Sequence, residues 1–203
     1  MSAGDTKLSI CSDAMIMLGA APISSFSEGT DAAQAADRLY DDIKDTLIAQ
    51  YPWPWSIKKT ALARLAAAPT NEWKYAYALP GDMIGEPRAL FDSSSVGMRP
   101  ITGWEVYGTS VFTNYASVWI DYQYQVEESK MPPYFIRVLK SALASAFAIP
   151  VADSSSKADF FHAMAFGNVS ANMRGGLMRV AMNIDGSVPP QAIEDFPLVA
   201  VRG

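Results

Sequence analysis

The sequence predicts an α+β fold: a helical bundle of two N-terminal and two C-terminal helices, an inserted antiparallel β-rich region, and an extended C-terminal tail. Near both ends of the 203-residue chain, apolar residues recur every three or four positions, whereas in the middle they alternate at every second position. The period changes at a proline- and tryptophan-rich corner, Pro52 to Trp55. We therefore expect a bundle of residues 1–55 and 130–178, a β-rich insertion of residues 56–129, and a docking tail of residues 179–203.

Two helices are expected before this corner. The first runs from Lys7 to Leu18, and Gly19 is suited to end it in the left-handed conformation. Thr30 is the expected N-cap of the second helix, which continues to about Gln50. Their apolar faces are formed by Leu8, Cys11, Ala14, Met15 and Leu18, and by Ala36, Leu39, Tyr40, Ile43 and Leu47.

The corner itself has two interpretations. Pro52 and Pro54 each push the preceding residue into an extended conformation, so the helix must end there. Trp53 and Trp55, held on a stiff turn, will bury a large apolar area. They are either a core plug between the helical part and the sheet or inter-subunit anchors that contact a neighbouring chain. The two roles are compatible.

Strand-like sequence follows the corner. The expected strands are Ile57–Arg64, Lys74–Leu79, Glu86–Phe91, Gly103–Val106, Ser110–Thr113 and Ser117–Gln125. An alanine-rich run, residues 61–68, is also compatible with a helix. The aromatic residues of this region could stack on single-stranded nucleic acid or sugar. Because basic residues are not interleaved with them, we expect them to fill sheet faces and interfaces instead.

Two further helices and a tail complete the chain. The third helix follows Met131 and is expected to stop at Pro150, and the fourth runs from about Lys157 to Leu177 behind a serine cap at residues 154–156. The tail is rich in apolar residues, which we expect to dock on a partner rather than remain in water. The docking residues predicted for this tail are Val188, Ile193, Phe196, Leu198, Val199 and Val201.

Composition restricts the classes of function. Charged residues make up 18% of the chain, below the roughly 25% typical of soluble domains, while hydrophobic residues make up 50%. This balance favours a homo-oligomer that buries part of each subunit's surface. A net charge of −5 argues against tight nucleic-acid binding. We found no apolar run near the roughly 20 residues of a membrane span and no signal peptide, so we expect no membrane partner and synthesis in a cytoplasm.

Residues typical of catalysis or metal binding are sparse. The single cysteine, Cys11, and the single histidine, His162, cannot form a disulfide or a Cys/His zinc cluster within one chain. The sequence lacks a phosphate-binding glycine loop, a nucleophile elbow and a His-Glu-x-x-His motif. Asp41, Asp42 and Asp45 are interpreted as a solvated helix face. We therefore predict no catalytic, cofactor or metal site and no enzyme activity.

The order of several motifs resembles one known family. A helix ends in Leu-Gly-Ala-Ala-Pro-Ile at Leu18–Ile23, and a loop with Gly29 and an alanine-rich helix with Leu39-Tyr40 and Asp45–Leu47 follow. A Pro52-Trp53 corner then precedes Tyr-Ala-Tyr-Ala-Leu-Pro at residues 75–80. Together, from about Leu8 to Leu177, these features resemble the head-to-tail adaptors, or tail tubular proteins A, of short-tailed bacteriophages. The doubled Pro-Trp and the sequence after Arg179 depart from that pattern.

The resemblance implies a structural virion protein of the neck. Such adaptors form a twelve-subunit ring, a homododecamer, that binds the portal protein on one side and the tail nozzle, or tail tubular protein B, on the other. Phage DNA passes through the lumen during ejection without sequence-specific binding. The implied localisation is the virion neck, after assembly in the host cytoplasm. The alternative is a virion-associated glycan or peptidoglycan hydrolase that uses carboxylates without a recognisable motif.

Overall fold

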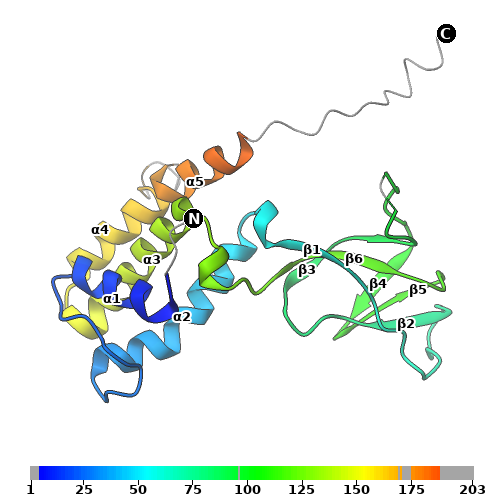
Figure 1. The fold of residues 1–203 in the computed structure, drawn as a ribbon, viewed down its shortest axis with the longest axis horizontal. Helices are drawn as coiled ribbons and strands as arrows, with labels where there is room; N and C mark the ends of the chain where they lie inside the picture. The colour runs from blue at the N-terminus through cyan, green and yellow to red at the C-terminus, as the bar shows by residue number, and fades with distance from the viewer. Residues whose placement is uncertain (1–4, 96, 169, 171–174, 188–203) are drawn as a thin grey trace, which may run out of the picture.

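The chain folds into a helical lobe and a β lobe joined by two chain crossings (Figure 1). The computed structural model describes residues 5–95, 97–168, 170 and 175–187. Within these residues the helical lobe consists of α1 (Lys7–Met17), α2 (Asp31–Ala49), α3 (Pro133–Ala152), α4 (Ser155–Phe166) and α5 (Gly176–Gly186). The β lobe consists of β1 (Ile57–Ala61), β2 (Tyr75–Ala78), β3 (Met83–Phe91), β4 (Trp104–Tyr107), β5 (Ser110–Thr113) and β6 (Trp119–Tyr124).

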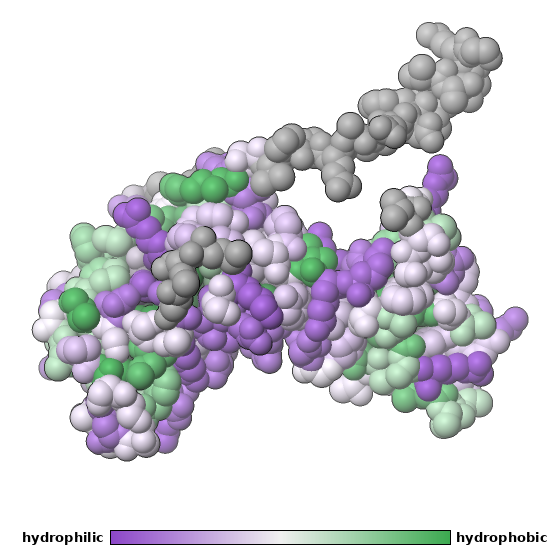
Figure 2. All heavy atoms as spheres, in the orientation of Figure 1, coloured by the Kyte–Doolittle hydropathy of each residue, from purple (hydrophilic) through white to green (hydrophobic). Residues whose placement is uncertain are grey.

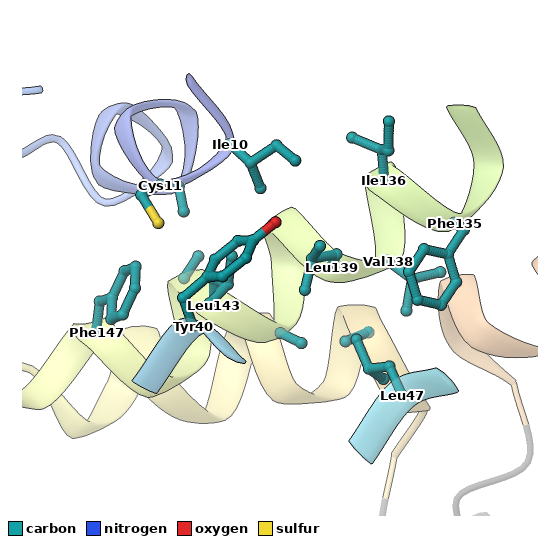
Figure 3. Close-up of a cluster of buried hydrophobic side chains, with 14 of the residues drawn as sticks. Ile10, Cys11, Tyr40, Leu47, Phe135, Ile136, Val138, Leu139, Leu143 and Phe147 are labelled. Carbon is teal, nitrogen blue, oxygen red and sulfur yellow. The ribbon is translucent and has the colours of Figure 1, made fainter. Parts of the chain in front are cut away.

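Helix α3 is the centre of the helical lobe, because α1, α2, α4 and α5 all pack against it. Ten of its residues are buried. Figure 3 shows side chains of α1, α2 and α3 converging in one cluster that includes Cys11, Tyr40 and Leu143. By length and composition alone, α3 is also apolar enough to cross a membrane. In this lobe, however, 56% of its most apolar 18-residue stretch is buried. That burial explains why a core helix is so apolar.

The predicted bundle of two N-terminal and two C-terminal helices with an extended tail is wrong. The described C-terminal part holds three helices, and α5 covers residues 176–186, most of which were assigned to an extended tail beginning at residue 179. Helix α5 forms because Met178, Ala181 and Asp185 recur at helical spacing and bury one face. The predicted docking residues of the tail, Val188 to Val201, lie outside the described residues.

The predicted ends of the C-terminal helices also need correction. Pro150 lies inside α3, which continues for one further half-turn and ends where Asp153 adopts a left-handed conformation with φ 43°. The predicted fourth helix to Leu177 is wrong, since α4 ends at Phe166. Gly167 (φ 95°) and Gly176 (φ 66°) both adopt backbone conformations that end or redirect a helix. The Thr30 and Ser154 N-caps are confirmed: each side chain accepts a backbone N–H from the first turn.

The β lobe contains two three-stranded antiparallel sheets, with strand orders β1-β6-β3 and β2-β5-β4. Buried residues from both sheets form a second core, which includes Tyr77, Leu90 and Ile120. All six strands fall within or overlap the predicted ones. The alanine-rich run leaves β1 after Ala61, and Arg64 then forms an isolated antiparallel bridge with Tyr77 of β2. The sheet register shifts between Ile84 and Ala89 of β3, where Gly85 has a φ of 71°.

Candidate functional site

The two lobes are joined at the corner between α2 and β1, next to the start of α3. Trp53 is fully buried there. Its ring centroid lies 4.7 Å from that of Tyr51 and 5.3 Å from that of Phe135, and its indole N–H donates a 3.1 Å hydrogen bond to the carbonyl oxygen of Leu47. One side chain thus fixes the corner to the last turn of α2 and to the first turn of α3.

Trp55 lies beside Trp53 in the short 3₁₀ turn Pro54–Ser56, with their ring centroids 5.8 Å apart. It packs edge-on against Phe135 at 4.8 Å, and it is only partly buried. Its indole nitrogen is buried and has no hydrogen-bond partner among the described residues. Trp55 therefore contributes apolar contact here without the backbone hydrogen bond that Trp53 makes.

The amide of Gln123 links the two lobes directly. Gln123 is on β6, the central strand of its sheet, and is buried. Its side-chain nitrogen donates to the carbonyl oxygens of Ile48 and Tyr51, both at 2.8 Å, and to Ser56 Oγ at 3.0 Å. Ser56 Oγ in turn donates to the Trp53 carbonyl oxygen at 2.9 Å. The β lobe thereby supplies a donor to the Ile48 carbonyl oxygen, which has none from Pro52, and adds a second donor to the Tyr51 carbonyl oxygen, which already accepts from the Trp53 N–H at 2.8 Å.

A second polar link lies next to this corner. Glu128, in the 3₁₀ turn Glu128–Lys130 after β6, accepts hydrogen bonds of 3.2 Å from the Tyr40 hydroxyl and from Lys44 Nζ on α2. Burial, and then the negative charge of Glu128, raise the pKa of the Tyr40 hydroxyl well above its usual range. Tyr40 therefore stays protonated and serves as a donor. Both chain crossings are thus tied to α2, one through Gln123 and one through Glu128.

Helix α5 is joined to the same region. The Tyr134 hydroxyl, at the start of α3, donates a 2.6 Å hydrogen bond to Asp185 Oδ1 of α5. Burial and the Asp185 carboxylate raise the pKa of Tyr134. The Tyr51 hydroxyl lies close to Gly186, at 3.5 Å from the position that a Cβ would take there. The corner, α3 and α5 consequently form one continuous contact region.

The acidic residues of α2 take part in pairs with other elements. Asp41 accepts a 2.9 Å hydrogen bond from Lys7 and lies 3.7 Å from Lys44, while Asp45 accepts a 2.9 Å bond from Gln125. Asp42 makes no hydrogen bond or ion pair with any described residue and lines a groove. In the described part of the chain, no group of three or more His, Cys, Asp and Glu residues is placed to hold a metal ion.

That groove lies between α2, α3 and α4 and has a volume of about 260 Å³. Ile43 and Leu47 of α2, Ala142 and Ala146 of α3, and Phe166 of α4 give it an apolar floor. Its polar lining residues are Asp42, Thr46, Gln50, Ser145 and His162. The rings of His162 and Phe166 are tilted relative to each other by 53°, with their centroids 5.1 Å apart. The sequence did not reveal this groove, because its walls come from three separated helices.

The aromatic residues of the β lobe do not form one exposed platform. Tyr77 and Tyr122 are buried in the second core. Elsewhere in this lobe, Glu105 accepts hydrogen bonds from Tyr107 and from the Trp73 indole N–H, and these bonds lower the pKa of its carboxyl group. Most of these rings therefore act as packing residues, in keeping with the expected sheet-face role.

The structure brings the two predicted anchor residues, Trp53 and Trp55, into the helical-lobe core cluster. Trp53 has no exposed surface with which to contact another chain, so it is the plug of its own subunit. Trp55 keeps part of its surface free, and its role as an inter-subunit anchor stays a prediction.

The sequence did not indicate the role of Gln123, because Gln123 looked like one of the polar residues that alternate along β6. No sequence signal marks it as buried.

In comparisons with known proteins, no family model matches the chain, and no curated protein matches it. The resemblance to the phage adaptors therefore rests on the order of the motifs named above.

Proposed function

We propose that the chain is a structural virion protein: the head-to-tail connector, or adaptor, of a short-tailed bacteriophage. In this role copies of the chain form a ring between the portal and the tail nozzle, and phage DNA leaves through the lumen. The observation that carries the proposal is the junction between the lobes. Trp53, Gln123 and Glu128 hold a helical lobe and a β lobe in one fixed relation. A subunit that binds one partner at each end needs such a joint.

The surface of the helical lobe supports assembly into a larger structure. Large hydrophobic side chains are exposed on four of its helices, and green hydrophobic areas are visible on this lobe in Figure 2. These exposed residues are Ile16, Met17, Ile149, Phe160, Val180 and Ile184. Neighbouring subunits in a ring would cover residues of this kind. A net charge of −5 also suits a conduit through which DNA must slide without being held.

The chemistry of the carboxyl groups gives the hydrolase alternative no support. A glycoside hydrolase needs a general acid whose pKa is raised. The shifts at Glu28, Asp82 and Glu105 all lower the pKa. For Asp82, burial raises the pKa, but hydrogen bonds from Lys58 and Tyr122 more than offset that effect. These three groups are suited to structural hydrogen bonding.

The proposal is tested by mixing the purified chain with the portal protein encoded in the same genome. Electron microscopy of the mixture should show a ring of added density at one end of the portal. Tail tubular protein B from the same genome should then bind the complex and should not bind the portal alone. Portal particles without added density would overturn the proposal.

A further inference from the structure

One side of the helical lobe presents the groove between α2, α3 and α4. Its floor is apolar, and at its rim stands Asp42, an exposed carboxylate with no ion-pair partner among the described residues. An unpaired acid beside an apolar depression is suited to a partner that brings both a hydrophobic side chain and a cation.

Another side of the lobe presents such a surface. Helix α5 buries Met178, Ala181 and Asp185 against its own lobe. Its outward face carries Val180 and Ile184, which are 52% and 46% exposed and lie one helical turn apart. Arg179 is exposed next to Val180 and forms no ion pair within the described residues. Together Arg179, Val180 and Ile184 are called the α5 ridge.

The ridge and the groove are two different patches of one subunit, with α4, which lines the groove, packed against α5. Helices α2 and α5 both pack on α3 but hardly touch each other. Figure 1 shows α5 along the upper edge of the helical lobe and α2 along its lower edge. A contact between two different patches of a subunit is heterologous, and repetition of such a contact generates a ring when the rotation closes.

We propose that the groove of one subunit receives the α5 ridge of the next copy of this chain, with Val180 and Ile184 on the apolar floor and Arg179 paired with Asp42 at the rim. The inference rests on the ring assembly of the proposed function and specifies its interface. A second copy is favoured as the occupant because the chain itself supplies the apolar side chains and the cation that the groove lacks.

Charge reversal tests the pairing. Asp42→Arg and Arg179→Asp should each raise the concentration needed for half-maximal assembly by about tenfold or more, because each places like charges together at the interface. The double variant should restore assembly to near the wild-type level, since the pair is then re-formed in reverse. Asp37→Arg, on the same helix and outside the groove lining, is the matched control and should leave assembly unchanged. Thermal unfolding of each variant checks that the fold is intact.

Mixing variants tests the heterologous geometry. Ala146→Trp should fill the groove and Ile184→Arg should disrupt the ridge, so each variant alone should remain monomeric. An equimolar mixture retains one intact groove and one intact ridge per pair of chains. It should therefore form complexes of two chains, measured by native mass spectrometry, and no rings. Rings from either single variant would contradict the proposed contact.

The outcomes separate this interface from the function on which it rests. If the wild-type chain assembles and binds portal but the Asp42 and Arg179 variants behave as wild type, the interface is overturned and the adaptor function stands. If deletion of residues 188–203 abolishes assembly while charge reversal has no effect, the tail is the occupant and the inference fails. If the wild-type chain stays monomeric with and without portal, both are overturned.

Discussion

The side-chain amide of Gln123, on the central strand of one sheet, donates a 2.8 Å hydrogen bond to the carbonyl oxygen of Ile48 in the last turn of α2. The two residues are 75 positions apart in the chain and belong to different lobes. Since the same amide also reaches Tyr51 and Ser56, one buried side chain fixes the orientation of the β lobe on the helical lobe. A rigid joint of this kind is what the adaptor proposal needs.

Replacing Gln123 with leucine should weaken this joint. The buried Ile48 carbonyl oxygen would lose its donor, while the Tyr51 carbonyl oxygen would keep only the Trp53 N–H, and we expect the free energy of unfolding to fall by about 2–3 kcal/mol. Urea denaturation measures the change. Gln125→Leu is the matched control: Gln125 is exposed and its side chain bonds only to Asp45 among the described residues, so the loss there should stay below about 1 kcal/mol. Equal losses in the two variants would contradict the special role of Gln123.

Phenylalanine substitutions should distinguish the two tryptophans of the corner. Trp53→Phe removes both buried volume and the N–H donor to Leu47, so we expect a loss of about 2–4 kcal/mol in unfolding free energy. Trp55→Phe removes no hydrogen bond within the described residues and should cost about 1 kcal/mol. Thermal and urea unfolding give both values. A larger loss for Trp55 would refute the assignment of Trp53 as the plug.

Trp55 is also the remaining candidate for an inter-subunit anchor. If its partly free surface contacts a neighbour, Trp55→Ala should reduce assembly by about tenfold or more, beyond any effect of the lower subunit stability. The measurement is the concentration dependence of assembly, with each variant held well below its unfolding temperature. Val111→Ala, a buried cavity-forming change in the second core, inside the β lobe, controls for lost stability. Similar assembly defects in the two variants would exclude an anchoring role.

Cys11 should be inert in the folded protein. Burial raises the pKa of its thiol from 9.0 to about 12, which keeps it neutral near physiological pH. Native protein at pH 8 should therefore react with a thiol-specific disulfide reagent at least about a hundred times more slowly than protein unfolded in guanidinium. Because folding raises this pKa, the contribution of the Cys11 thiol to the free energy of unfolding is complete below pH 9. That contribution declines as the pH rises toward 12. Rapid reaction of the native thiol would contradict the packing in Figure 3.

Alanine at Gly176 should disrupt the start of α5. A Cβ there would lie 2.5 Å from the Gly167 nitrogen and 2.7 Å from the Ala165 carbonyl oxygen, at a φ of +66°. We expect a loss of at least about 2 kcal/mol in unfolding free energy. At Gly186 the nearest atom would be the Tyr51 hydroxyl oxygen at 3.5 Å, so Gly186→Ala should change stability by less than about 0.5 kcal/mol. Denaturation of the two variants side by side decides the point.

Local signals in the sequence predicted several individual elements correctly. Ser110–Thr113 is a strand with the predicted bounds, and Thr30 caps α2 as expected. These features depend on neighbouring residues, such as an alternating pattern or a hydroxyl one residue before a helix. The division into a helical part from both chain ends and a β-rich middle followed from the same local periods.

Features that depend on distant residues could not be predicted in this way. Pro150 does not end α3, although it removes the backbone N–H that would bond to the carbonyl oxygen of Ala146. Gly167 and Gly176 break the predicted last helix, and α5 then forms from residues assigned to the tail. Gln123 looks like a solvent-facing strand residue until α2 is packed on it. The groove beside Asp42 exists only once three helices are assembled.

The most direct test of the adaptor proposal is the mass of the complex formed with portal protein. Native mass spectrometry, or light scattering after gel filtration, would compare the portal ring alone with the ring after addition of excess chain. The account predicts a gain equal to twelve copies of the 22.0 kDa chain for each portal ring. An unchanged portal mass, with the added chain eluting as a monomer, would contradict it.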